Sequence, residues 1–438
     1  MTDRQKARRI ACAMALATVA VAAQAQNGRP AEKAPGADRP ILGLTEKDAP
    51  FATESAMVYP KTIGWPEGRT PVAPRGWRVT KFAGGLDHPR QALILPNGDV
   101  IVAEARTELK PDVEPEQARA RHMARGYGFS ANRLTLLRDA DGDGVAEQRH
   151  VLREGLNQPF GMQYVDGRLY VANTDAVVSF PYRPGETRLT GTPHTVVTLP
   201  AGGYNNHWTR NLLLSPDNRT LYVSVGSASN VAENGMDEEK RRAAILAVDL
   251  ASGRERLYAS GLRNPVGMDW VPGSGTLWTA VNERDHLGDD ISPDYLVGVR
   301  EGGFYGWPYS FYGQQDPRHA NNRRDLLATT LMPDVAVGAH AAALGLAFAK
   351  GTPADRQYAY VARHGSWNRS SLNGYDVLAV PFAQGRPTAA PQPFLTGFVA
   401  DAKKREVFGR PVSIQTRTDG AMYVVDDAGD TVWLVRRA

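Results

Sequence analysis

Short apolar runs separated by turn residues recur along most of this chain. Residues 98–104, GDVIVAE, and residues 167–173, GRLYVAN, each place an apolar run after a glycine and one charged residue. Runs of this length, rich in Val, Leu and aromatic residues and bounded by Gly, Pro, Asn or Asp, predict β-strands. The chain shows no long amphipathic helical pattern beside them.

One phrase, an apolar strand followed by a turn and a second β-rich strand, occurs six times. The copies lie at residues 88–104, 158–173, 209–226, 264–281, 343–362 and 410–426. Each has the pattern of a β-hairpin, with Pro, Asn, Asp or Gly in its turn. The copies begin roughly 50 to 80 residues apart, and further strand candidates such as RLTLLRD lie between them.

These repeats predict an all-β fold, a six-bladed β-propeller with four-stranded blades around a central channel. The alternative is a pair of β-sandwiches, which does not explain why one phrase recurs across the whole chain. We expect the propeller to occupy residues 76–438. Residues 26–75, rich in Pro, Gly and charge, predict a partly flexible N-terminal extension.

Residues 1–25 have the pattern of a cleaved export signal. Basic residues precede the apolar run ACAMALATVAVAA, and Ala23-Gln24-Ala25 offers a small-x-small cleavage pattern. The run is too short to remain as a membrane span, so we expect a periplasmic or secreted protein. The alternative is a buried N-terminal helix. The only cysteine, Cys12, lies in this segment, so we expect no disulfide in the mature chain.

The net charge also depends on that segment. The whole chain carries +4, and residues 1–25 hold four basic residues and one acidic residue, which leaves about +1 for the remainder. A nearly neutral chain lacks the electrostatic support for nucleic-acid binding, so we expect no nucleic-acid partner. The sequence makes no prediction of the oligomeric state.

Residues that precede the first strand of each predicted blade should converge at one mouth of the channel. They are Arg90, Gln91, Gln158, His207, Arg210, Arg263, Asn264, His340 and Arg410. So many arginines predict a cradle for a ligand with several carboxylates or phosphates; the alternative is that individual arginines pair with local acids. His207 is a candidate general base, against the alternative of a packed or surface histidine.

Two acidic stretches are candidates for metal binding. Residues 282–295 are dense in oxygen donors, which suit Ca²⁺, although a solvated acidic loop has the same composition. In residues 138–150, Asp139, Asp141 and Asp143 match the opening of an EF-hand loop, but position 12 is His150 instead of Glu. We expect a tight hairpin turn there and a candidate structural Ca²⁺ site that includes Glu147.

Several long motifs resemble the soluble pyrroloquinoline quinone (PQQ) dependent sugar dehydrogenases, with the closest likeness to an L-sorbosone dehydrogenase-like branch. The motifs are GLRNPVGMDW (261–270), GGFYGWP (302–308), HWTRNLLLSPDNRTLYVSVGS (207–227), VNERDHLGDDISPDYL (281–296) and HGSWNRSSLNGYDV (364–377). The resemblance covers roughly residues 76–438. It implies a quinoprotein that oxidises a sugar or sugar aldehyde by hydride transfer to the quinone C5, with Ca²⁺ as Lewis acid.

The resemblance also implies roles for particular residues. His207 corresponds to the catalytic base. The implied cofactor-binding residues are Arg263, Asn264, Arg410, Tyr305 and a basic residue at Arg363 or His364. The implied ligands of the catalytic Ca²⁺ are the backbone carbonyls of Glu283 and Arg284. Three features depart from the family pattern: Val266 replaces a glutamine, Glu283-Arg284 in a longer loop replaces Gly-Pro at the carbonyl ligands, and Ser227 stands where a carboxylate orients the base.

The sequence leaves two other functions open. A Ca²⁺-dependent lactonase-type hydrolase would need carboxylates that point into the channel, but no ring of arginines. A non-catalytic propeller that binds carbohydrate or protein would expose aromatic side chains on its rim. The chain has no CxxCH haem motif, so for the dehydrogenase we expect a separate electron acceptor, a quinone or a cytochrome.

Overall fold

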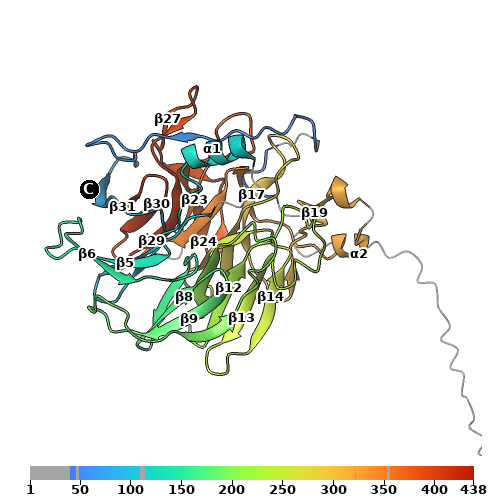
Figure 1. Ribbon diagram of the computed structural model, residues 1–438. Helices are drawn as coiled ribbons and strands as arrows, with labels where there is room; N and C mark the ends of the chain where they lie inside the picture. Colours follow the sequence, from blue (N-terminus) through green and yellow to red (C-terminus); the bar gives the residue numbers. More distant parts are fainter. Residues whose placement is uncertain (1–39, 46–48, 109–113, 321, 353–355) are drawn as a thin grey trace, which may run out of the picture.

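The computed structural model describes residues 40–45, 49–108, 114–320, 322–352 and 356–438. The predicted signal segment, residues 1–25, lies outside the described residues. Of the predicted extension, residues 40–45 and 49–75 are described, and they run along the strands at one end of the molecule (Figure 1).

Within the described residues, six sheets have four or more strands each. The first contains β3 (Pro89–Ile94), β4 (Val100–Glu104), β5 (Arg133–Arg138) and β6 (Gln148–Arg153). The second contains β7 (Met162–Val165), β8 (Arg168–Ala172), β9 (Ala176–Pro181) and β10 (His194–Thr198). The third contains β11 (Arg210–Leu214), β12 (Thr220–Val225), β13 (Ala244–Asp249) and β14 (Glu255–Ser260), with β18 (Gly303–Phe304) parallel to β14.

The remaining three large sheets follow the same order. The fourth contains β15 (Pro265–Trp270), β16 (Leu277–Val281), β17 (Pro293–Gly298) and β21 (Val335–Ala339). The fifth contains β22 (Ala343–Phe348), β23 (Gln357–Arg363) and β24 (Asp376–Ala383), with β25 (Arg386–Pro387) and β26 (Gln392–Leu395) both paired to β24. The sixth contains β29 (Pro411–Thr416), β30 (Met422–Asp426) and β31 (Thr431–Arg437), and β2 (Trp77–Ala83) completes it from the start of the domain.

Short elements cover the ends of these sheets. They are β1 (Lys61–Thr62), β27 (Val399–Asp401), β28 (Glu406–Val407), β19 (Ser310–Phe311), β20 (Gln314–Gln315), α1 (Pro115–Met123), α2 (Arg324–Leu327) and the 3₁₀ helix η1 (Pro317–His319). Among the described residues, no helix is long and apolar enough to cross a membrane.

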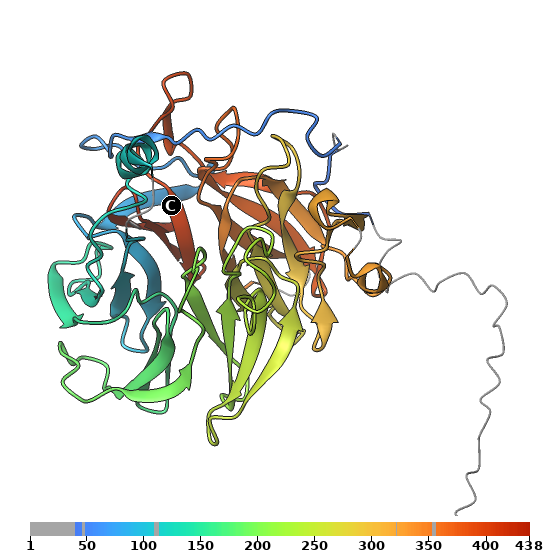
Figure 2. The same ribbon diagram turned by 45° about the vertical axis from the view of Figure 1, so that its right-hand side comes forward.

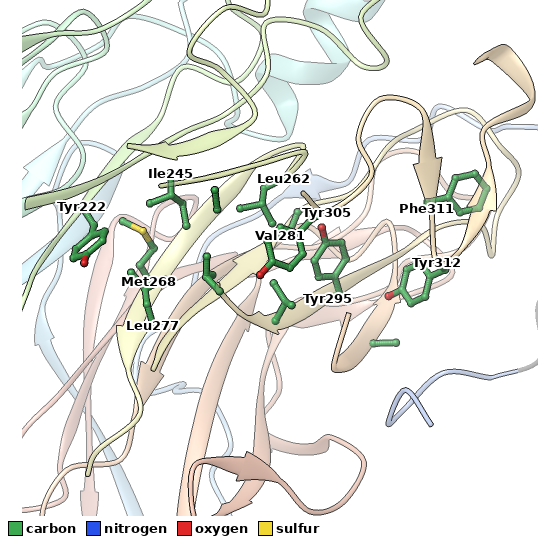
Figure 3. Close-up of a cluster of buried hydrophobic side chains, with 14 of the residues drawn as sticks. Tyr222, Ile245, Leu262, Met268, Leu277, Val281, Tyr295, Tyr305, Phe311 and Tyr312 are labelled. Atoms are coloured by element: carbon green, nitrogen blue, oxygen red, sulfur yellow. The ribbon is translucent and has the colours of Figure 1, made fainter. Parts of the chain in front are cut away.

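The hydrophobic core is divided into layers between neighbouring sheets. Strands such as β4 and β16 are buried along their whole length, because a sheet with another sheet on each face has no solvent side. Figure 3 shows the layer between the third and fourth sheets, where Tyr222 and Ile245 face Met268 and Leu277. Corresponding clusters lie between each successive pair of sheets.

The first strands of the six sheets contact one another in chain order, and β29 of the last sheet contacts β3 of the first. The sixth sheet joins β2 to β31, so strands from both ends of the domain close the arrangement (Figure 2). The all-β prediction is therefore confirmed, and the repeated four-stranded sheets are consistent with a β-propeller.

Most first strands begin in the same way. Proline follows His88, Gln158, Asn264 and Arg410, and a proline at a strand start removes no ladder hydrogen bond. The register shifts near the start of β3, β15, β22 and β29, which re-aims the neighbouring side chains. The backbone is therefore irregular at the end of the sheets where the residues before these strands lie close together.

Candidate active site

A cavity of about 410 Å³ lies where these strands begin. Its walls come from the residues that precede the first strands, from α1 and from the segment ahead of β1. Figure 1 and Figure 2 show α1 and that segment lying across the same end of the sheets. A concave site of this size, with polar groups that converge on it, is the usual form of a small-molecule site.

Five of the predicted site residues line this cavity. They are Arg90, His207, Asn264, His364 and Arg410, which come from five different sheets or from the loops ahead of them. The repeat therefore predicts correctly that Arg90, His207, Asn264 and Arg410 lie together, and His364, which only the resemblance implies, lies with them. Their contact with a cofactor stays a prediction.

His207 is held by residues on the loop that follows β12. Its Nδ1 lies 2.9 Å from the carbonyl oxygen of Ser227 and 3.0 Å from the Ser227 Oγ. The carbonyl can only accept, and the Ser227 Oγ already donates to the carbonyl of Ser229 at 2.6 Å. Nδ1 must therefore carry the proton, which leaves the lone pair on Nε2. Serine thus orients the ring where the resemblance implies a carboxylate.

The charge of His207 follows from its surroundings. Burial and the nearby Arg263 guanidinium lower the pKa of His207 to about 3, although the Ser227 hydrogen bond opposes the shift. The ring is neutral at neutral pH. A neutral imidazole with a free Nε2 can accept a proton.

Asn264 and His207 meet at a glycine. A Cβ on Gly226 would lie 2.4 Å from the Asn264 Oδ1 and 2.5 Å from the His207 Cβ, so only glycine allows both side chains to approach. The Asn264 Oδ1 is buried and has no hydrogen-bond partner among the described residues. A buried acceptor normally has a hydrogen-bond donor. Because Asn264 lines the cavity, a bound ligand can supply that donor.

Asp427 was not predicted, and it organises one side of the cavity. Its fully buried carboxylate accepts hydrogen bonds from Arg90 Nη1 and, at 2.8 Å, from His364 Nε2. His88 Nε2 lies 3.4 Å from it. Burial lowers the pKa of His364 to about 4 and that of His88 to about 3, whereas the adjacent His364, His88 and Arg90 hold the pKa of Asp427 well below its usual range despite burial. One carboxylate therefore joins residues of the first, fifth and sixth sheets.

Arg410 differs from the other predicted arginines. Its Nε donates to the carbonyl of His364 at 2.9 Å, and its Nη2 donates to the carbonyl of Gly365 at 2.8 Å. It has no carboxylate partner among the described residues, and it lines the cavity. Its charge remains available for an anionic ligand.

Arg263 does not line the cavity. Its fully buried guanidinium donates to Asp285 at 2.8 Å, to the carbonyl of Glu283 at 2.6 Å and to both oxygens of Asn230. It fixes loops from the third and fourth sheets, and Asp285 and Asn230 line the cavity in its place. Burial raises the pKa of Asp285, but Arg263 and His340 outweigh burial and hold it well below its usual range.

Three other predicted residues also point elsewhere. Arg210 is fully buried and donates to the carbonyl of His207 at 2.6 Å, so it supports the loop that carries His207. Arg363 forms a two-point ion pair with Asp376. Gln91 lines a second cavity of about 620 Å³ between the first strands. Three of the predicted arginines, Arg90, Arg263 and Arg363, thus pair with local acids, and the mouth is less cationic than the sequence suggests.

Tyr305 lies in the hydrophobic layer between the third and fourth sheets (Figure 3). Its hydroxyl donates to the carbonyl of Gly298 at 3.1 Å and accepts from the Arg300 N–H at 2.9 Å. It does not line the cavity. Its position supports a structural role, not the cofactor contact that the resemblance implies.

The predicted calcium ligands are not arranged as expected. The carbonyl of Glu283 already accepts from Arg263, and neither Glu283 nor Arg284 lines the cavity. The Arg284 side chain is fully buried and ion-paired with Glu283 and Asp316. Asn282 and Asp285, on either side of this pair, do line the cavity, and the Arg263 guanidinium donates to a side-chain oxygen of each, at 2.9 Å and 2.8 Å.

The second acidic stretch forms the predicted turn between β5 and β6. Asp139, Asp141, Asp143 and Glu147 place one oxygen each within 4.8 Å of one another. The turn is closed by internal hydrogen bonds, such as that from the Gly142 N–H to Asp139 at 2.7 Å. Calcium binding there stays a prediction.

The sequence provides a signal for the missed carboxylate. Residues 426–430, DDAGD, place three acids at the end of β30 and in the turn before β31. Asp426 accepts from the Arg410 N–H at 2.7 Å and from the Trp65 indole N–H at 2.6 Å. Asp430 bonds Arg125 at 2.7 Å. Acids this dense at the end of a buried strand need partners, and the predicted arginines supply some of them.

Comparison with known proteins agrees with this fold. The family model described as TrAA12-like matches residues 123–294 and 310–438, so the chain belongs to the TrAA12-like family. An uncharacterized protein of Borreliella burgdorferi is 31% identical over 300 residues, which cover 65% of this chain and 77% of that protein.

A pyrroloquinoline quinone-dependent pyranose dehydrogenase of Coprinopsis cinerea is 23% identical over 424 residues, which cover 83% of this chain. The chain spans about half, 54%, of the length of that relative.

Solved structures share the architecture. The holo form of the pyranose dehydrogenase PQQ domain from Coprinopsis cinerea has a TM-score of 0.68 and 21% identity, over 86% of this chain and 100% of the other. The calcium structure of the Trichoderma reesei family AA12 enzyme has a TM-score of 0.69 and 21% identity, over 88% of this chain and 100% of the other. At these identities the likeness establishes the fold.

Proposed function

We propose that this protein is a PQQ-dependent sugar dehydrogenase that oxidises a hydroxyl or aldehyde group of a sugar. The observation that carries the proposal is His207, a neutral histidine with a fixed tautomer that lines the same cavity as Asn264 and Arg410. The names of the relatives, which include PQQ-dependent sugar oxidoreductases, support the same class.

The cavity fits this cofactor. PQQ is flat and carries three carboxylates. Arg410 would bind a carboxylate, and Asn264 would gain a partner for its buried oxygen. The aromatic side chains of Trp208, Trp367 and Tyr59 would cover a flat ring system. When bound, PQQ supplies an electrophilic ortho-quinone that accepts hydride, and Ca²⁺ supplies Lewis-acid polarisation.

The residues of the chain perform the proton transfer. His207 Nε2 would take the proton from the substrate hydroxyl, and the Ser227 carbonyl would stabilise the N–H at Nδ1 as the ring becomes charged. Arg210 keeps the His207 loop in place through the His207 carbonyl. For Ca²⁺, Asn282 and Asp285 are the oxygen donors that we propose in place of the Glu283 and Arg284 carbonyls.

We further propose a six-bladed propeller, which the closed circle of first strands supports. We propose export to the periplasm or medium from the pattern of residues 1–25. We also propose that the substrate is a sorbosone-like sugar aldehyde. The electron acceptor that we propose is a separate quinone or cytochrome. Trp208 and Trp307 are buried, whereas a carbohydrate-binding rim would expose them.

Titration of the purified apoprotein with PQQ, with and without Ca²⁺, tests the proposal. The quinone absorbance is followed first, and a panel of aldoses and sugar aldehydes is then added with an artificial electron acceptor. We expect one-to-one binding and sugar-dependent bleaching. Absence of binding in both conditions would reject the dehydrogenase and favour the hydrolase or the binding module.

A further inference from the structure

A strap of chain, residues 51–63, crosses the open side of the cavity. It is bound along its length by hydrogen bonds to loops within the fourth and fifth sheets and to the turn before β28. Phe51 N–H donates to the Leu287 carbonyl at 2.8 Å, Val58 N–H donates to the Trp367 carbonyl at 2.6 Å, and Lys61 N–H donates to the Arg405 carbonyl at 2.8 Å. β1, at the end of the strap, also pairs with β28. The strap is therefore fixed to the rest of the protein at several points along its length.

The strap contributes two residues to the lining of the cavity, Met57 and Tyr59. α1 supports them from the side. Arg121 Nε donates to the Tyr59 hydroxyl at 3.0 Å, and the Arg121 guanidinium lies 5.7 Å from the centre of the Tyr59 ring. The Thr62 hydroxyl donates to the Ala124 carbonyl at 3.2 Å. Strap and helix thus form one wall.

Tyr59 also meets the opposite wall. Its ring stacks on Trp367, with centroids 5.6 Å apart and planes 6° apart, and His286 packs edge-on against the same Trp367 at 6.0 Å. A stacked tyrosine held at its hydroxyl has little freedom to move aside. The Tyr59–Trp367 contact therefore limits the space above the floor that His207 and Arg410 line.

This wall lies outside the part of the chain that matches the family. The match begins at residue 123, whereas Met57, Tyr59 and Arg121 precede it. The floor of the cavity, with His207, Asn264 and Arg410, lies inside the match. The family match therefore includes these floor residues but not the strap.

We propose that Tyr59, held by Arg121 and stacked on Trp367, restricts the substrate to a single sugar unit. The cavity of about 410 Å³ is near the lower end of the roughly 300–1,000 Å³ typical of small-molecule sites. Under the proposed function, on which this inference rests, that volume holds both cofactor and substrate. A second sugar unit would need the space that Tyr59 occupies.

The test compares Tyr59→Ala with Tyr59→Phe and with Ile63→Ala. Ile63 lies on the same strap, is half exposed and does not line the cavity, so its variant is the matched control. The assay measures kcat/KM for the aldose with the highest activity and for the disaccharide that carries the same unit at its reducing end. We expect Tyr59→Ala to raise the ratio of disaccharide to monosaccharide kcat/KM about tenfold or more. Tyr59→Phe keeps the ring and should change the ratio far less.

A second measurement needs no cofactor. Hydroxyl-radical labelling of the apoprotein, read by mass spectrometry, should show Trp367 several times more reactive in Tyr59→Ala than in Ile63→Ala. If the wild type binds no PQQ, the proposed function fails. If it binds PQQ but Tyr59→Ala keeps the wild-type sugar ratio or the wild-type Trp367 labelling, the role of Tyr59 is overturned while the proposed function stands.

Discussion

Replacement of Asp427 by asparagine removes the buried negative charge that lies between the side chains of Arg90, His364 and His88. Asparagine has nearly the same shape and keeps one acceptor oxygen, so the substitution changes the charge and little of the packing. Arg90, 7% exposed, then keeps a buried positive charge without its carboxylate. His364 and His88 are neutral at neutral pH and need only an acceptor.

The expected loss follows from that uncompensated charge. Breaking a buried ion pair by removing one partner costs about 3–5 kcal/mol, so we expect Asp427→Asn to lower the free energy of unfolding by about that amount. At about 2.1 cal/mol/K per residue, a chain of roughly 400 residues has an unfolding entropy of about 0.8 kcal/mol/K. The loss therefore corresponds to a fall in Tm of about 4–6 °C.

Urea unfolding followed by tryptophan fluorescence measures the change at pH 7. Asp419→Asn is the matched control, because Asp419 is a half-exposed aspartate that pairs with Arg417 on the surface, and it should change stability by less than about 0.5 kcal/mol. Arg90→Met combined with Asp427→Asn removes both charges and should recover much of the loss. A loss below about 1 kcal/mol for Asp427→Asn alone would refute the reasoning.

Asp427 also makes the free energy of unfolding depend on pH. The folded pKa of Asp427 is depressed, so its contribution is fully present above the unfolded value near about pH 4 and disappears as pH falls through the folded pKa. The difference in stability between wild type and Asp427→Asn should therefore be constant from pH 7 to about pH 5 and shrink below about pH 4. A difference that grows on acidification would contradict this sign.

Three further predictions concern the cavity. Gly226→Ala should displace His207 and Asn264 and lower kcat/KM by about a hundredfold, because its Cβ would lie within 2.5 Å of both; activity within twofold of wild type would contradict the geometry. Arg263→Ala should lower the free energy of unfolding by about 3 kcal/mol or more, measured by urea unfolding. Asn264→Ala should weaken PQQ binding, measured by titration, with little loss of stability. If Arg263→Ala instead weakens PQQ binding and keeps the wild-type stability, Arg263 is the direct ligand. Because the pKa of His207 is lowered to about 3, kcat/KM should show no acid limb from this group between pH 8 and pH 5, and a limb centred near the ordinary value of 6.5 would contradict a buried neutral His207.

The repeated hairpin was sufficient to predict the all-β fold and the convergence of residues from different sheets. Arg90, His207 and Arg410 lie in one cavity because each lies at or just before the start of a first strand, and the position of a residue relative to a strand is readable from the pattern. The direction of a long side chain is not readable in this way. Arg263 turns toward Asp285 in the loop between β16 and β17, and Arg363 turns toward Asp376, its cross-strand partner in β24.

The cover of the site could not be predicted either. Tyr59 lies far from His207 in the sequence, and the strap meets the cavity only because β1 pairs with β28 from the last third of the chain. α1 has no buried residues, so its sequence has no apolar stripe from which a helix could be predicted. Asp427 was missed because the hairpin pattern ends at β30, one residue before it.

The most direct test of the account is the rate of quinone bleaching in a single turnover, measured for wild type and for His207→Gln at equal cofactor occupancy. The account predicts that both proteins bind PQQ and that sugar bleaches the variant at least about a hundredfold more slowly, since His207 Nε2 is the proton acceptor. Equal rates in the two proteins would show that another group takes the proton, and the assignment of this cavity's chemistry to His207 would be wrong.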